Sequence, residues 1–268
     1  AVAMDGAITG ATNITLSGEL DAATLDISGN ADIDGTMEAD AYTLGGASFI
    51  KVEGTNFTDS LIVGHTTTGT LDAAARNTIV GIDAGDARTT SDDNVIIGYE
   101  AGTALTAATG NVLVGSYAGK TRSGLTDCVA VGMNSLYTDG QAYNTAIGKD
   151  ASYYTTGIYN TTLGWNAGKG TTSSSSSRNS FIGASAGSAI TSGGYNIAFG
   201  YTSGDNITTG SGNVVIGKAD VSSATGDDQL SISDGEDGSV VWMTGDSSAN
   251  ITFAAEVAAA TLDISGNI

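Results

Sequence analysis

Few residues in this chain have the types and spacing that catalysis requires. The 268 residues include one histidine, His65, and one cysteine, Cys128. His65 lies in the polar stretch GHTTTG, and no Cys/His cluster accompanies it as a metal site would require. No motif marks a serine as an activated nucleophile. The sequence therefore predicts that the protein is not an enzyme.

Oxygen ligands for a hard cation gather in three acidic stretches, at residues 92–93, 227–228 and 234–237. Calcium prefers carboxylates held close together in turns. None of the three stretches has the spacing of a helix-loop-helix calcium site or of a calcium-binding nonapeptide. We therefore predict no cofactor, and structural calcium is the alternative left open.

Aromatic residues concentrate in the middle of the chain. Exposed rings can stack on sugars while tyrosine hydroxyl groups bind sugar hydroxyls, which would suit a receptor-binding surface. The competing interpretation is that the rings fill gaps between loops or between protein chains. The candidate glycan contacts are Tyr143, Tyr153, Tyr154, Tyr159, Trp165, Tyr195 and Tyr201.

A repeat that occurs nine times must position most of these rings. Each copy begins with Asn, followed by two variable residues, a large apolar residue, Gly, two variable residues and, in most copies, Ala-Gly. Successive copies are 16 to 19 residues apart, and Cys128 replaces the asparagine in the fourth copy. The asparagine and glycine positions are Asn77, Gly81, Asn94, Gly98, Asn111, Gly115, Asn144, Gly148, Asn160, Gly164, Asn179, Gly183, Asn196, Gly200, Asn213 and Gly217.

Each column of the repeat predicts a structural role. The large apolar column, from Val80 to Ile216, is expected to face a continuous core. The glycine that follows predicts a positive φ or a close backbone approach. Asparagine suits a turn because it tolerates the left-handed region, and stacked copies would form an amide ladder. We expect a short strand, a glycine corner and a polar return in every coil, stacked as a solenoid.

A second repeat brackets the first. Residues 13–30 and 250–267 are identical at thirteen of eighteen positions, and their apolar residues alternate as in half-buried strands. We predict a fibrous β segment over 1–70, the repeat solenoid over 71–221 and a C-terminal β segment over 222–268. Because the second copy stops at Ile268 where the first continues, we expect more shaft to follow.

Composition and charge agree with an all-β fibre. The chain has 39 glycines, no proline and 14% charged residues, which argues against a helical or a collagen-like protein. The net charge is −20, concentrated at the two ends, and it repels nucleic acid and anionic membrane surfaces. The longest apolar runs are too short to cross a bilayer. We predict neither nucleic-acid binding nor membrane insertion.

The units NTAIGKDAS, NTTLGWNAG and NSFIGASAG resemble the head repeats of trimeric autotransporter adhesins and, more closely, the repeats of phage tail-fibre proteins. The stretches LDISGNADIDGT and 229–250 look like the segments that lead into and out of such repeats. The resemblance implies a homotrimer in which three chains build a left-handed parallel β-roll. It implies other fibre or tail proteins as partners, and a host-surface glycan or protein as a further one.

These observations predict an all-β, trimeric β-solenoid that forms the shaft of a virion tail fibre or of a cell-surface appendage and supports host attachment. The main alternative is an adhesin whose tyrosine-rich repeats bind glycans directly. A monomeric solenoid and a fibre-based depolymerase are further alternatives. Solution mass distinguishes the monomeric solenoid, and a polysaccharide-cleavage assay distinguishes the depolymerase.

Overall fold

The computed structural model describes residues 42–44, 47–54, 57–64, 74–87, 89–121, 123–138, 141–171 and 174–254, with side chains from residue 59 onward. His65 lies outside the described residues, as do residues 13–30 and most of 250–267. The described residues form strands, turns and irregular segments, with no helix among them.

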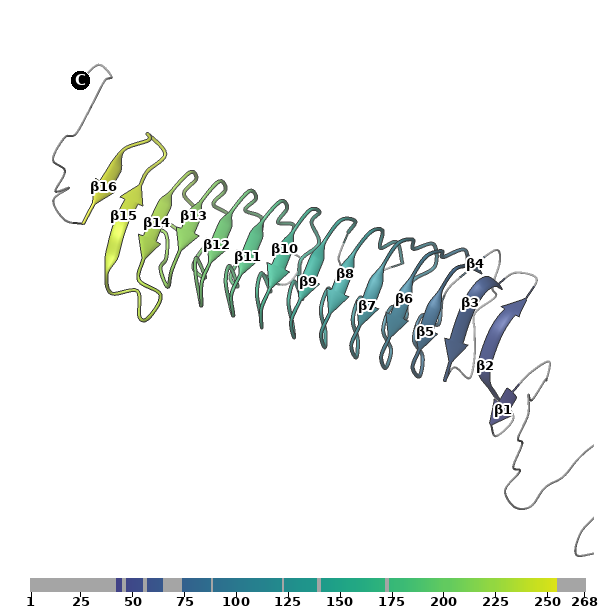
Figure 1. Ribbon diagram of the computed structural model, residues 1–268. Coiled ribbons are helices and arrows are strands. Elements are labelled where there is room, and N and C mark those ends of the chain that lie inside the picture. Colours follow the sequence, from purple (N-terminus) through teal and green to yellow (C-terminus); the bar gives the residue numbers. More distant parts are fainter. Residues whose placement is uncertain are drawn as a thin grey trace, which may run out of the picture. The chain divides into compact units, whose positions relative to one another are not determined.

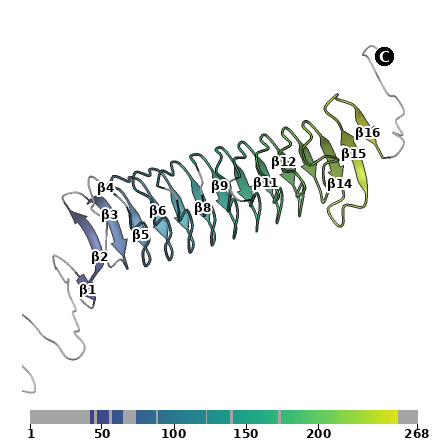
Figure 2. The same ribbon diagram turned by 180° about the vertical axis from the view of Figure 1, so that it is seen from behind.

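The strands in this part of the chain form one sheet in which they lie side by side in sequence order, except for the two-residue strand Ala74–Ala75, which lies off this row (Figure 1). Figure 2 shows the same row from behind, with the return segments that join each strand to the next. The strands are β1 Tyr42–Leu44, β2 Ala47–Gly54, β3 Phe57–Val63, β4 Ala74–Ala75, β5 Thr78–Val80, β6 Val95–Ile97, β7 Val112–Val114, β8 Val129–Val131, β9 Thr145–Ile147, β10 Thr161–Leu163, β11 Ser180–Ile182, β12 Ile197–Phe199, β13 Val214–Ile216, β14 Leu230–Ser233, β15 Val241–Gly245 and β16 Ile251–Phe253.

Each of the nine predicted repeats contributes one three-residue strand, β5 to β13. These strands pair in parallel, and the register places equal repeat positions opposite one another, as with Val80 and Ile97. The predicted all-β stack of nine repeats is therefore confirmed as a β-solenoid.

The parallel stack is one strand longer at each end than the nine repeats. β3 pairs in parallel with β5, and β14 pairs in parallel with β13, so the stack passes both predicted boundaries of the 71–221 segment. Ser60 and Gln229 stand where the repeats have asparagine. Beyond these strands the pairing becomes antiparallel, with β1 and β2 at one end and β15 and β16 at the other.

The prediction that the large apolar column faces the core is wrong. In a three-residue strand the middle side chain points to one face and its two neighbours point to the other. Ile79 is fully buried, whereas Val80 is 36% exposed. The inward column is the variable one, two residues after each start: Ile79, Ile96, Leu113, Ala130, Ala146, Thr162, Phe181, Ala198 and Val215.

The invariant glycine closes the strand at a corner where no side chain fits, as predicted. Gly148 has a φ of +134°, and a Cβ on it would lie 2.4 Å from the carbonyl oxygen of Gly164 in the next coil. The same contact recurs from Gly81 to Gly200. Backbones of adjacent coils therefore touch directly at this corner.

The predicted asparagine ladder is present and buried. The Asn94 side-chain oxygen accepts hydrogen bonds from the backbone N–H and the side-chain amide of Asn111, at 3.0 and 2.8 Å. The same amide of Asn111 also donates to the carbonyl of Leu125 on the return segment, 3.0 Å away. The left-handed backbone lies at the preceding residue, such as Tyr143 (φ +65°), and not at the asparagine. Each asparagine thus joins its coil to the next and to its own return segment.

Candidate functional site

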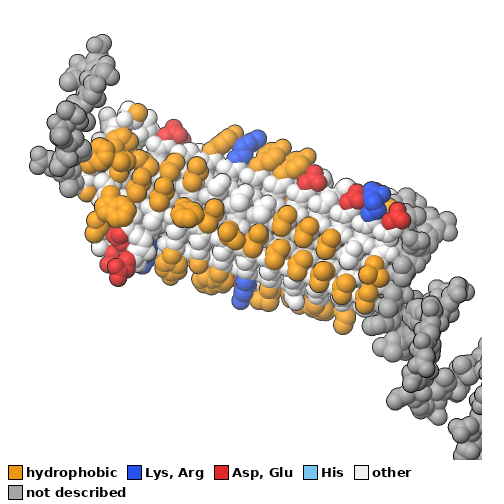
Figure 3. Space-filling view, in the orientation of Figure 1, with side chains coloured by type: hydrophobic (Ala, Val, Ile, Leu, Met, Phe, Trp, Pro, Cys, Tyr) orange, Lys and Arg blue, Asp and Glu red, His pale blue; other side chains and the backbone are white. Residues whose placement is uncertain are grey.

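The outward face of the sheet carries two columns of side chains, one and three residues after each asparagine. We call these two columns the apolar stripe. In the nine repeats the second column is apolar throughout, whereas the first mixes Val and Ile with Thr78, Thr145, Thr161 and Ser180. In the second column Ile147 is 37% exposed, Leu163 44% and Phe199 55%. Rows of apolar side chains run along this face in Figure 3. Contiguous exposed apolar surface of this kind marks an interaction site in a soluble protein.

The stripe continues through both ends of the solenoid, although the pairing there changes. The register places Val63 of β3 in line with Val80, and Ile232 of β14 in line with Met243 of β15 and Phe253 of β16. Neither column contains a charged residue between β3 and β16. The complete second column is Val63, Val80, Ile97, Val114, Val131, Ile147, Leu163, Ile182, Phe199, Ile216, Ile232, Met243 and Phe253.

The residues directly before the asparagine column form one border of this face, which we call the leading edge. Tyr143 and Tyr159 stack there with ring centroids 5.0 Å apart and planes 5° apart. The Arg178 guanidinium lies 5.5 Å from the Tyr159 ring centroid and 5.3 Å from that of Tyr195. Four successive coils therefore carry one Tyr-Tyr-Arg-Tyr stack.

The residues directly after the glycine column form the opposite border, the trailing edge. Tyr99, Trp165 and Tyr201 are exposed there by 43%, 52% and 56%. Lys218 lies with its Nζ atom 5.5 Å from the Tyr201 ring centroid. The trailing edge thus carries half-exposed large side chains in several coils and the small Ser116 and Ala184 in two others.

A polar cluster surrounds Tyr99. The Glu100 carboxylate accepts a hydrogen bond from the Tyr99 hydroxyl, which raises the pKa of Tyr99 to about 12. Lys120 forms an ion pair with the same carboxylate and, with Tyr99, lowers the pKa of Glu100. The Lys120 Nζ atom also lies 4.5 Å from the Tyr117 ring centroid. Tyr99 therefore stays a neutral hydrogen-bond donor through the physiological pH range.

The structure does not gather the seven candidate glycan contacts on one surface. Three of them lie on the leading edge and two on the trailing edge. The other two, Tyr153 and Tyr154, are half-buried on the turn that follows the trailing edge. Tyr153 stacks on Tyr137 with centroids 4.7 Å apart. A neighbouring ring therefore covers one face of each of Tyr143, Tyr159 and Tyr153.

Carboxylates in all three acidic stretches accept hydrogen bonds from donor groups of the protein itself. Asp92 accepts a hydrogen bond from the Ala75 N–H at 2.7 Å, and Asp93 pairs with Arg76. Asp227 accepts one from the Ser211 N–H. Over the described residues no group of three or more His, Cys, Asp or Glu side chains could hold a metal ion.

Asp234 organises the loop between β14 and β15. Its two carboxylate oxygens accept hydrogen bonds from the N–H groups of Val240, Asp237, Gly238 and Glu236, at 2.7 to 3.0 Å. These bonds, with that of Val240 the largest cause, lower the pKa of Asp234 to about 2.

We expect Asp234→Asn to lower the melting temperature at pH 7. A depressed pKa stabilises the fold above the ordinary carboxyl value, near 4, and this stabilisation is lost as the pH falls toward 2. The difference in melting temperature from the native chain should therefore shrink between pH 4 and pH 2. Glu236→Gln is the control, because it removes an equal charge but none of these acceptors. A difference that does not change with pH would contradict the role of the carboxylate.

Cys128 interrupts the asparagine ladder. Its backbone N–H donates to the Asn111 side-chain oxygen at 3.0 Å, and its Sγ donates to the Gln141 carbonyl at 3.1 Å. Burial raises the pKa of the thiol, which keeps it protonated and unreactive.

We expect Cys128→Asn to stabilise the protein. The new amide would donate to Asn111 and to the Gln141 carbonyl, and its oxygen would face the N–H of Asn144, as in the other coils. One or two buried hydrogen bonds contribute on the order of 1 kcal/mol. Thermal unfolding checks this, with Cys128→Ala as the matched control. An Asn variant less stable than the Ala variant would contradict it.

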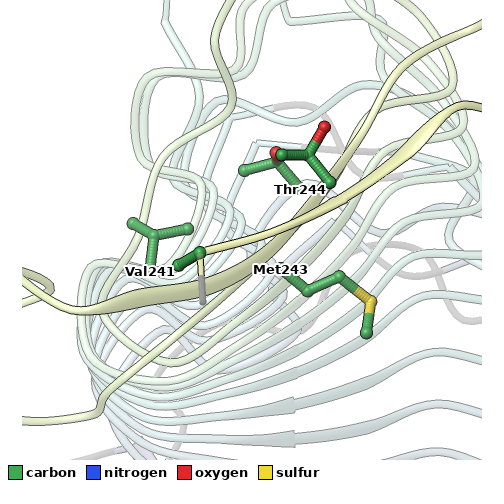
Figure 4. Close-up of a pocket in the computed structure, with 5 residues that line it drawn as sticks. Val241, Met243 and Thr244 are labelled. Atoms are coloured by element: carbon green, nitrogen blue, oxygen red, sulfur yellow. The ribbon is translucent and has the colours of Figure 1, made fainter. Parts of the chain in front are cut away.

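The β15–β16 end of the sheet contains a shallow hollow. Val241, Met243 and Thr244 line it with Thr252 and Ala254, and its volume is about 190 Å³ (Figure 4). Ligand pockets are usually about 300–1,000 Å³. The hollow is therefore too small for a typical ligand.

Within the described ranges no helix has the length and apolar character needed to span a membrane. Comparison of the chain with protein-family models, with curated proteins and with solved structures found no match.

Proposed function

We propose that this chain is a structural shaft segment of a fibre, on a virion or on another surface appendage, and that three copies associate through the apolar stripe. The observation that carries the proposal is the unbroken apolar column from Val63 to Phe253. Every residue in this column is large and apolar, both on the strands that pair in parallel and on those that pair antiparallel, so the column persists where the pairing changes.

The occupant of such a stripe must be as long as the sheet. A second copy of the chain lying parallel to the first has that length and presents an equally apolar surface. Parallel copies related by rotation place identical residues around one axis, where a charged residue would repel its own copies. The absence of charge from both columns supports this kind of assembly.

The resemblance of the repeat units to those of trimeric fibre proteins supports three copies.

A shaft of this kind would act mechanically, holding a host-attachment tip away from the particle that bears it. Repeated coils joined by the glycine contacts and the asparagine ladder suit such a role. Direct glycan binding has less support, because the seven candidate rings lie on two opposite edges and on a turn and do not form one surface.

Light scattering coupled to size-exclusion chromatography tests the proposal. We expect a mass three times the 26.6 kDa of one chain, and an elongated particle by electron microscopy. A mass of one or two chains at micromolar concentration would overturn it.

A further inference from the structure

The half-exposed large side chains of the two edges fall in the same coils. Tyr159 (48% exposed) and Trp165 (52%) flank strand β10. Tyr195 (63%) and Tyr201 (56%) flank strand β12 in the same way. On β9, Tyr143 on the leading edge corresponds to Lys149, which is exposed on the trailing edge.

Within one chain these partners cannot touch. They lie at opposite borders of the sheet face, with the strand and the glycine corner between them. On the leading edge each ring stacks on a residue of the next coil and not on a residue across the face. The side of each ring that points away from the chain is therefore open. Each edge therefore presents a row of large side chains whose contacts from outside the chain are unfilled.

Symmetry determines which residues of two copies meet. Rotation about an axis parallel to the stack leaves the height of every residue unchanged. If three faces enclose the stripe, the leading edge of one copy adjoins the trailing edge of the next at each corner of the triangle. The side chains that meet there belong to the same coil, because adjacent coils are about 4.8 Å apart along the axis.

We propose that the leading edge of one copy packs against the trailing edge of the next, with Tyr143 on Lys149, Tyr159 on Trp165 and Tyr195 on Tyr201. This inference rests on the proposed assembly and specifies its corners. The first pair is a cation–π contact and the other two are aromatic pairs, each favourable at a partly desolvated site.

In the coil of β11, between the second and third pairs, a large residue on one edge is matched by a small residue on the other. Its leading edge carries the long side chain of Arg178, and its trailing edge carries the small Ala184.

Cross-linking tests the pairing. In a Cys128→Ser background, Tyr159→Cys combined with Trp165→Cys should oxidise to a covalent trimer on a non-reducing denaturing gel. The matched control combines Tyr159→Cys with Tyr201→Cys, two coils out of register by about 10 Å, which exceeds disulfide reach. We expect several-fold less covalent trimer from the control.

A second measurement, the fluorescence emission of Trp165, tests the same pair in a chain that keeps both rings. In a Trp242→Phe background, Trp165 is the remaining tryptophan, and its emission should lie further to the blue than in a Tyr159→Ala variant of the same background. If the mass is that of three chains but both cysteine pairs give equal yields of covalent trimer, the pairing is overturned and the assembly stands. Unchanged tryptophan emission in a chain of that mass has the same consequence. A mass of one chain would overturn both.

Discussion

Leu163→Asp combined with Phe199→Asp is expected to reduce the solution mass from three chains to one. Both side chains lie on the apolar stripe and are 44% and 55% exposed in the single chain, so neither substitution opens a cavity in the core. In an assembly of three, six carboxylates would face one another in an apolar interior. Burial of unpaired charge costs several kcal/mol for each group, more than most interfaces tolerate.

The control for this variant is Thr171→Asp combined with Ser192→Asp. These two residues are exposed on return segments, away from the stripe, and add the same charge. We expect that variant to remain at three chains. Far-UV circular dichroism should show the β spectrum for both variants. A stripe variant that stays fully assembled would show that the stripe is not the interface.

Gly148→Ala is expected to destabilise the solenoid by roughly 2–5 kcal/mol. The added Cβ would lie 2.4 Å from the carbonyl oxygen and 2.6 Å from the carbonyl carbon of Gly164. Those atoms are backbone and cannot rotate away. The φ of +134° adds strain for any residue with a Cβ. Thermal unfolding should therefore occur at a clearly lower temperature.

Gly124→Ala is the matched control, since its Cβ would meet nothing within 4 Å and its φ is not in the left-handed region. It should be neutral or slightly stabilising. Because solenoid stability depends on contacts between neighbouring coils, hydrogen exchange in the Gly148→Ala variant should rise most in β9 and β10. Equal stability of the two variants would refute the close approach.

Local repetition in the sequence predicted the positions of the coils. The glycine column predicted the corner, since a residue type that never varies over nine copies reflects a backbone restriction. The asparagine column likewise predicted a ladder, because equal residues stack when repeats are in register. Neither inference needs knowledge of distant parts of the chain.

The ends of the stack were harder to predict. Neither Ser60 nor Gln229 is an asparagine, and Gln229 is followed four residues later by Ser233 in place of the signature glycine, so neither coil matches the full repeat pattern. They join the stack because their strands offer the same backbone pairing and their side chains still bond the ladder. Ser60 accepts from the N–H of Asn77, and the side-chain amide of Gln229 donates to Asn213.

The sequence alone determined the period, the stacked β architecture and the two columns that admit little variation. Only the tertiary structure decided which face of each strand is inside. Val80 and Ile79 are equally apolar, so hydrophobicity could not rank them. A three-residue strand turns only its middle side chain inward. The chain turns after the glycine, so that the rest of the coil lies on the side of the sheet where Ile79 points. The most constant apolar column therefore faces outward, and the inward column varies because a core accepts different side chains as long as its volume is filled.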